Sequence, residues 1–180
     1  MDLKRTAFDG LFEIEPRILQ DERGYFFESY QKQKLADQGL DVDFVQDNQS
    51  YSVGNVIRGL HFQKAPFAQG KLVRVISGQA LDVVVDLRRD QPTYGKHYCC
   101  LLDSKKGNML YVPEGFAHGF AALEPTIFFY KCTNYYHKAS ESGIIWNDPE
   151  LGIDWGINQP EVSNKDQKLL PFAEVISELD

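Results

Sequence analysis

The chain has 180 residues, of which 43% are hydrophobic and 25% are charged, and this composition and length predict one soluble domain spanning residues 1–180. Its formal net charge of −7 argues against nucleic-acid binding as a general property of the surface. No apolar run approaches the roughly 18 residues that a membrane-spanning helix needs, and the first ten residues lack the apolar stretch of a signal peptide. We therefore expect a cytoplasmic protein that binds neither nucleic acid nor membrane.

Short β-rich segments follow one another along most of the chain. One helix is predicted over residues 31–38, where Gly39 stops it, and a second short one near residues 165–169. Strands are predicted over residues 43–52, 55–62, 71–76, 79–87, 97–102, 109–112 and 126–133. Many strands with few helices indicate a β-sandwich or a β-barrel.

The clearest alternation of apolar and polar residues lies in residues 79–87. One face of this strand carries Leu81, Val83, Val85 and Leu87, and the other carries Asp82 and Asp86. By the same rule, the adjacent Cys99 and Cys100 point to opposite faces of a strand, so we expect one in the core and one toward solvent. An odd total of three cysteines does not predict a disulfide framework.

From Gly107 the chain reads GNMLYVPEGFAHGFAA, with Pro113, Gly115 and His118 at fixed spacings. This stretch resembles the second cupin motif, Gly-x5-Pro-x-Gly-x2-His-x3-Asn, at every fixed position except the last, where Ala122 replaces Asn. The resemblance implies an all-β, cupin-like jelly-roll barrel with few short helices.

The metal ligands of the cupin motifs are largely missing. The first cupin motif ends Glu-x6-Gly, with the Glu as a metal ligand, but the residue at this spacing before Gly78 is Lys71. His61 is the one histidine in the region that should supply two. Metals are held by deprotonated or neutral donors, and an ammonium has no lone pair to offer. We therefore predict a site without metal, built from a base, a cation and acids.

A series of short blocks narrows the resemblance. They are DERGYFFES (21–29), QDN (46–48), RGLHFQ (58–63), QGKLVRV (69–75), PEGFAHGF (113–120), YK (130–131), WNDP (146–149), GIDW (152–155) and SNKD (163–166). In this order and spacing they closely resemble the dTDP-4-dehydrorhamnose 3,5-epimerase family, from about Phe12 to Leu170. The resemblance implies an isomerase of dTDP-L-rhamnose synthesis that acts on a dTDP-linked 4-keto-6-deoxyhexose and requires no cofactor.

Epimerisation beside a ketone needs a base on one face of the sugar, stabilisation of the enolate oxygen, and an acid on the other face. His61 is the candidate base, and the resemblance supplies Asp166 as the carboxylate of a His–Asp dyad that fixes the imidazole tautomer. Lys71 is the candidate cation for the enolate oxygen. Tyr130, within the expected strand 126–133, matches the Tyr-Lys step of the family and is the candidate acid.

Recognition of the nucleotide part calls for other residues. Arg23 and Arg58 match phosphate contacts of the family, and Lys165 adds charge. The remaining candidate contacts are Glu28, Gln46 and Asn48 for the nucleotide, Tyr135 for stacking on thymine, and Glu141 and His118 for the substrate. His118 has a second interpretation, as a structural polar residue inside the barrel.

The resemblance also implies a homodimer. Arg23 and Glu28 fall on the early strands, and in the family this N-terminal arm crosses to the partner subunit. Each site would then be completed by the other chain.

Three alternatives stay open at this point. A 3-only or 5-only epimerase of a related dTDP-4-keto-6-deoxy sugar would use the same catalytic residues. A metal-dependent cupin oxygenase is disfavoured by Lys71 and by the missing second histidine. A non-catalytic nucleotide-sugar binding module is disfavoured because binding alone does not need His61, Asp166 and Tyr130 together.

Overall fold

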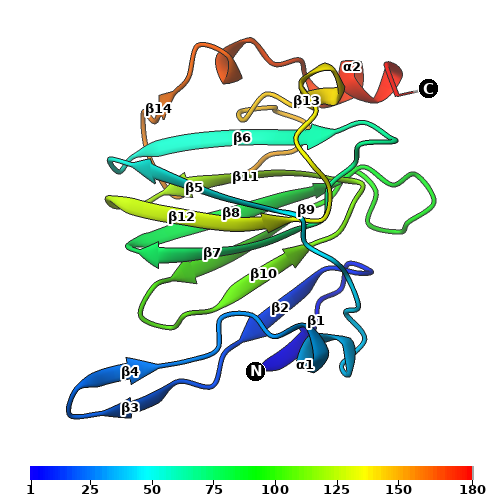
Figure 1. Cartoon of the computed structure of the whole chain (residues 1–180). Helices are drawn as coiled ribbons and strands as arrows, with labels where there is room; N and C mark the ends of the chain where they lie inside the picture. Colours follow the sequence, from blue (N-terminus) through cyan, green and yellow to red (C-terminus); the bar gives the residue numbers. More distant parts are fainter. Residues whose placement is uncertain (180) are drawn as a thin grey trace.

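Two β-sheets face each other in the computed structural model, which describes residues 1–179 (Figure 1). The first sheet has the order β1 (Asp2–Arg5), β2 (Phe12–Glu15), β10 (Met109–Val112), β7 (Lys71–Ser77), β12 (Thr126–Cys132) and β5 (Gln46–Ser52). The second has the order β13 (Glu141–Gly143), β6 (Val56–Gln63), β11 (Phe116–Ala122), β8 (Gln79–Asp86) and β9 (His97–Asp103), and β14 (Glu161–Val162) pairs in parallel with β6. A hairpin of β3 (Leu19–Asp21) and β4 (Gly24–Phe26) projects from this body.

Helices are few and short in the described residues, as predicted. They are α1 (Lys32–Ala36), α2 (Phe172–Ser177) and the 3-10 turns η1 (Lys138–Ser140) and η2 (Asp166–Lys168). The α1 helix begins where expected, because the side chain of Gln31 accepts a hydrogen bond from the backbone N–H of Lys34. No helix among residues 1–179 is long and apolar enough to cross a membrane. The all-β, cupin-like jelly-roll prediction is confirmed, while the domain end predicted at Asp180 lies outside the described residues.

The core between the sheets follows from alternation along the strands. In β7, Val73 and Val75 are buried inside the barrel, and Lys71 projects inward on the same face to line a cavity. Leu72 and Arg74 point outward, where Leu72 packs on a separate cluster and Arg74 lies over aromatic rings. The strand therefore carries one cation into an otherwise apolar interior.

A stacked aromatic pair joins the two sheets and lines the same cavity as Lys71. The rings of Phe120 in β11 and Phe128 in β12 lie 4.0 Å apart between centroids, with their planes 2° from parallel. Both side chains are buried, and burying an aromatic side chain stabilises a fold by about 1.5–3 kcal/mol. This contact fixes the spacing between β11 and β12, which both carry predicted site residues.

The alternation predicted for residues 79–87 is present in β8, but both faces of the strand are buried. Asp82 and Asp86 are each 0% exposed, so the acidic face is not a solvent face. The apolar face lies outside the barrel, under the C-terminal segment, in a cluster that includes Leu81, Val83, Val85, Leu87, Trp155, Phe172 and Val175. The prediction for the paired cysteines is confirmed, since Cys99 is exposed and Cys100 is buried.

Several elements were not predicted from the sequence, and β11 is the most important of them. All seven of its residues are buried, so it has no polar face from which alternation could be read. A close approach of glycines brings β6 against it. A Cβ added at Gly59 would lie 2.5 Å from the Cα of Gly119, and the φ of Gly59 is +133°. The strands that carry Arg58, His61 and His118 are therefore held close together.

Candidate active site

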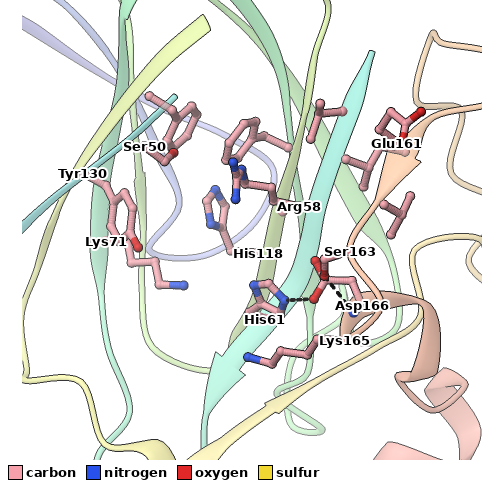
Figure 2. A pocket seen from close by; sticks show the side chains of 16 residues that line it. Ser50, Arg58, His61, Lys71, His118, Tyr130, Glu161, Ser163, Lys165 and Asp166 are labelled. Carbon is pink, nitrogen blue, oxygen red and sulfur yellow. Dashed lines mark hydrogen bonds and ion pairs between the residues drawn. The ribbon is translucent and has the colours of Figure 1, made fainter. Parts of the chain in front are cut away.

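A cavity of about 550 Å³ lies between the two sheets and receives side chains from both (Figure 2). The second sheet contributes Arg58 and His61 from β6 and His118 from β11, whereas the first contributes Lys71 from β7 and Tyr130 from β12. The C-terminal segment adds Glu161, Val162, Ser163, Lys165 and Asp166. A smaller cavity of about 140 Å³ shares His61, Lys71 and Tyr130 with the first. The four residues predicted for catalysis are thus brought together in one place.

His61 and Asp166 form a hydrogen-bonded dyad at one side of the cavity. The distance between His61 Nε2 and Asp166 Oδ1 is 2.7 Å, and Asp166 Oδ2 accepts the backbone N–H of Gly59 at 3.3 Å. Burial by itself would raise the pKa of Asp166, but the hydrogen bond from His61 leads the effects that bring this pKa below its usual value. An ionised carboxylate only accepts hydrogen bonds, so Nε2 of His61 donates, and Figure 2 shows the other ring nitrogen turned toward the cavity.

Lys71 and Tyr130 lie on the sheet opposite the dyad. Figure 2 shows both side chains across the cavity from His61. Burial lowers the pKa of Lys71, while Asp82 and Glu141 act in the opposite direction. Burial raises the pKa of Tyr130, so its phenol keeps its proton at neutral pH. A base and a proton donor therefore face each other across the space that a ligand would fill.

The guanidinium of Arg58 is held at the cavity by the neighbouring sheet. Its Nε donates to Ser52 Oγ at 3.1 Å, and one terminal nitrogen donates to the backbone carbonyl of Tyr51 at 3.0 Å. Guanidinium has five N–H donors in a fixed plane, so the bonds to β5 leave others free to meet an anion.

Glu141 sits between two groups at the rim of the smaller cavity. Its Oε2 lies 2.7 Å from Lys165 Nζ and accepts the phenol of Tyr136 at 3.0 Å. Burial would raise the pKa of Glu141, but the hydrogen bonds from Lys165 and Tyr136 lower it overall. Lys165 and Glu141, predicted as separate substrate contacts, are ion-paired with each other.

Gln46 and Asn48 line the same smaller cavity from β5. Gln46 donates to Asn48 Oδ1 at 3.0 Å and accepts the backbone N–H of Tyr136 at 2.9 Å. Tyr136 itself lines this cavity, whereas the predicted stacking residue Tyr135 lines neither cavity and is 65% exposed. The sequence alone could not show which of these two adjacent tyrosines faces the cavity.

Two predicted contacts lie away from both cavities. Arg23 is on the projecting hairpin, where it forms a 2.5 Å ion pair with Asp21. Glu28 follows the hairpin and forms an ion pair with Lys34 of α1. Their distance from the cavities of their own chain agrees with the predicted role in the site of a partner chain, which stays a prediction.

Sequence reasoning missed the partner of His118. Nε2 of His118 lies 2.8 Å from Oδ2 of Asp82, and both side chains are buried. The signal available was the acidic face of residues 79–87, which alternation alone could not assign to the barrel interior. Within residues 1–179, no group of three or more His, Cys, Asp and Glu side chains is arranged to hold a metal ion. Activity without metal stays a prediction.

Comparison with known proteins gives consistent matches over nearly the whole chain. A model of the dTDP-4-dehydrorhamnose 3,5-epimerase family matches residues 5–174. A curated dTDP-4-dehydrorhamnose 3,5-epimerase from Salmonella typhimurium is 49% identical over 165 residues, which are 90% of this chain and 90% of that protein. A crystal structure of dTDP-6-deoxy-D-glucose-3,5-epimerase from Legionella pneumophila, in complex with dTDP-4-keto-L-rhamnose, has a TM-score of 0.93 and 41% identity, covering 99% of this chain and 96% of that chain. A dTDP-4-dehydrorhamnose 3-epimerase from Streptomyces niveus is 38% identical over 176 residues, which are 97% of this chain and 85% of that protein.

Proposed function

The chain belongs to the dTDP-4-dehydrorhamnose 3,5-epimerase family, and from that premise we propose how it converts dTDP-4-dehydro-6-deoxy-D-glucose to dTDP-4-dehydro-L-rhamnose. The observation that carries the proposal is that the His61–Asp166 dyad and Tyr130 lie on opposite sides of one cavity. Lys71 lies on the same side as Tyr130, on the neighbouring strand. Inversion of a carbon next to a ketone requires removal of a proton on one face and its return on the other. Two sheets that each carry one of these groups supply that arrangement.

His61 begins the reaction by taking the hydrogen from C3 or C5 on its free ring nitrogen. Asp166 holds the imidazole in the tautomer that leaves this nitrogen free, and it stabilises the imidazolium that forms. The electron pair of the broken C–H bond moves into the ring, and the negative charge develops on the oxygen at C4. The ammonium of Lys71 stabilises that charge.

Tyr130 completes each inversion from the opposite face. Its phenol donates a proton to the carbon, and the phenolate is then restored by solvent while His61 returns its proton to solvent. Burial disfavours the phenolate, so the phenol keeps its proton until the enolate forms, and the phenolate regains a proton readily before the next cycle. The same pair can act on C3 and C5 if the sugar turns within the cavity.

The nucleotide part of the substrate is assigned to the rim of the cavities. Arg58 and Lys165 meet the diphosphate, and Gln46 and Asn48 meet the nucleoside. Lys165 would exchange Glu141 for a phosphate oxygen, so Glu141 becomes free to contact the substrate. Tyr136, which lines the smaller cavity, takes the stacking role first assigned to Tyr135.

A homodimer accounts for the two contacts that lie away from the cavity. The hairpin that carries Arg23 exposes large apolar side chains, with Tyr25 66% and Phe26 65% exposed. Apolar groups on a projecting hairpin favour docking on another surface. We propose that this surface belongs to a second copy of the chain, whose cavity then receives Arg23 and Glu28. We also propose a cytoplasmic location, where the three free cysteines would remain reduced.

The regiospecificity separates the leading proposal from its nearest alternative. Identity is higher to the Salmonella 3,5-epimerase than to the Streptomyces 3-epimerase, which favours reaction at both carbons. Incubation with substrate in deuterated water, followed by proton NMR of the product, tests this directly. Deuterium at both C3 and C5, with both centres inverted, is the expected result. Deuterium and inversion at C3 alone would establish the 3-epimerase instead.

A further inference from the structure

A buried carboxylate behind the cavity is not used in the mechanism above. Asp82 of β8 is 0% exposed, and its cross-strand neighbours are Phe120 in β11 and Cys100 in β9. Both neighbours belong to the core between the sheets. One oxygen, Oδ1, has no hydrogen-bond partner among the described residues. A buried charge with an unpartnered oxygen destabilises a fold, so its presence in an apolar interior calls for a reason.

The other oxygen of Asp82 determines which ring nitrogen of His118 carries a hydrogen. Oδ2 lies 2.8 Å from Nε2, so the carboxylate accepts and Nε2 carries the hydrogen. Nδ1 is then the ring nitrogen left for a ligand, and His118 lines the cavity. Its cross-strand partner is His61, the proposed base, so the two imidazoles lie side by side on β11 and β6.

The charge of Asp82 also reaches the opposite sheet. The ammonium of Lys71 projects into the same cavity (Figure 2). Asp82 is one of the groups that oppose the effect of burial on the pKa of Lys71. The other titratable groups facing Lys71 are Cys132 on β12 and Glu141 on β13, and those facing Asp82 are His118 and the thiols of Cys99 and Cys100. Asp82 is therefore hydrogen-bonded to one side chain of the cavity, His118, and acts electrostatically on a second, Lys71.

We propose that Asp82 is a positioning residue of the epimerase, which holds His118 with Nδ1 toward the oxygen at C4 and balances the positive charge that His118 and Lys71 present there. The inference rests on the proposed function. In this step His118 carries a hydrogen on both ring nitrogens: Nε2–H stays bonded to Asp82, which stabilises the imidazolium, and Nδ1–H donates a hydrogen bond to the oxygen at C4 as the enolate forms. Asp82 lines neither cavity, whereas His118 lines the larger one, so Asp82 acts through His118.

The variant Asp82→Asn keeps the side-chain volume and removes the charge. We expect kcat to fall by about 10²-fold, the effect of losing one donor to a developing oxyanion, with little change in dTDP affinity by calorimetry. Loss of the carboxylate also lets Lys71 give up its proton at lower pH, so the basic limb of the kcat profile should move to lower pH. The matched control is Asp86→Asn on the same strand, which removes an equally buried carboxylate that pairs with Arg88 and Thr93. It should lower stability and leave the pH profile in place.

The outcomes separate the inference from the proposed function. Failure of the wild-type protein to epimerise would refute the proposed function. If the wild type is active and Asp82→Asn shares the pH profile of Asp86→Asn, the role of Asp82 is refuted. A second measurement needs no variant that might fail to fold, because ¹⁵N NMR can assign the protonated ring nitrogen of each of the four histidines. The inference requires a hydrogen on Nε2 of His118, and a bare Nε2 would overturn it.

Discussion

Replacement of Lys71 by Met should make the protein more stable and nearly inactive. The ammonium of Lys71 is surrounded by protein except where it meets the cavity, and no ion pair or hydrogen bond joins it to another described residue. Met has a similar length and no charge. Removing a poorly compensated buried polar group is worth about 1–3 kcal/mol, so the free energy of unfolding should rise by about that amount. Turnover should fall by about 10²–10³-fold, because the enolate loses its fixed positive charge.

The pH dependence of this stability difference gives a sharper test. The folded-state pKa of Lys71 is lowered, so below that pKa the folded protein must charge a desolvated amine, and the wild type is at its greatest disadvantage. As pH rises from the folded pKa toward the unfolded value near 10.4, the difference between wild type and Lys71→Met should shrink. Urea unfolding of both proteins at neutral and alkaline pH measures it. The exposed Lys105 provides the control, since Lys105→Met should stay within about 0.5 kcal/mol of wild type at each pH. A variant no more stable than wild type at pH 7, or a difference that does not depend on pH, would refute the reasoning.

Three further predictions concern recognition, assembly and acid stability. Arg58→Ala should weaken dTDP binding, measured by calorimetry, about ten- to hundredfold, which is the contribution of one charge-assisted hydrogen bond. The control Arg74→Ala, outside the barrel, should leave the affinity unchanged. Equal affinities of the two variants would contradict the assignment of Arg58 to the diphosphate. Mixing an Arg23→Ala chain with a His61→Ala chain should restore part of the activity, because one site of each mixed dimer carries neither lesion, and the absence of rescue would argue against a shared site. Because the folded-state pKa of Asp166 is lowered, its ionised form stabilises the fold above the unfolded pKa near 3.9, and this contribution disappears as pH falls through the folded value. Asp166→Asn should therefore lose less stability than wild type on acidification, as measured by thermal unfolding at pH 7 and pH 3, and an identical loss would rule out this contribution.

The sequence predicted the catalytic side chains that point into the cavity, because the spacing of residues along a strand determines which face each side chain lies on. His61, Lys71 and Tyr130 lie on three strands whose alternation directs each side chain inward, and block spacing linked them to Asp166. The hydrogen bond between His61 and Asp166 joins residues 105 positions apart, and only the family resemblance could have paired them. Their mutual distances depend on sheet packing, which a linear pattern does not encode.

The remaining features depended on facts that a single sequence does not contain. Alternation in β8 separated Asp82 from its apolar neighbours, but it could not show that the acidic side faces the interior while the C-terminal segment covers the other. Tyr136 lines the smaller cavity and Tyr135 does not, because of the path that their loop follows. Arg23 carries the right chemistry, yet its position on a projecting hairpin makes its role depend on a second chain.

In the proposed mechanism, a base on one sheet and an acid on the other invert the same carbon. Tyr130→Phe tests it most directly, since it removes one hydroxyl from the acid side and leaves the His61–Asp166 dyad intact. The measurement is proton NMR of substrate incubated with this variant in deuterated water, which follows exchange and configuration at C3 and C5 separately. Exchange of hydrogen for deuterium should persist while inversion falls by about 10²–10⁴-fold, because the enolate still forms and is reprotonated from the face of His61. Inversion at the wild-type rate would show that Tyr130 is not the acid.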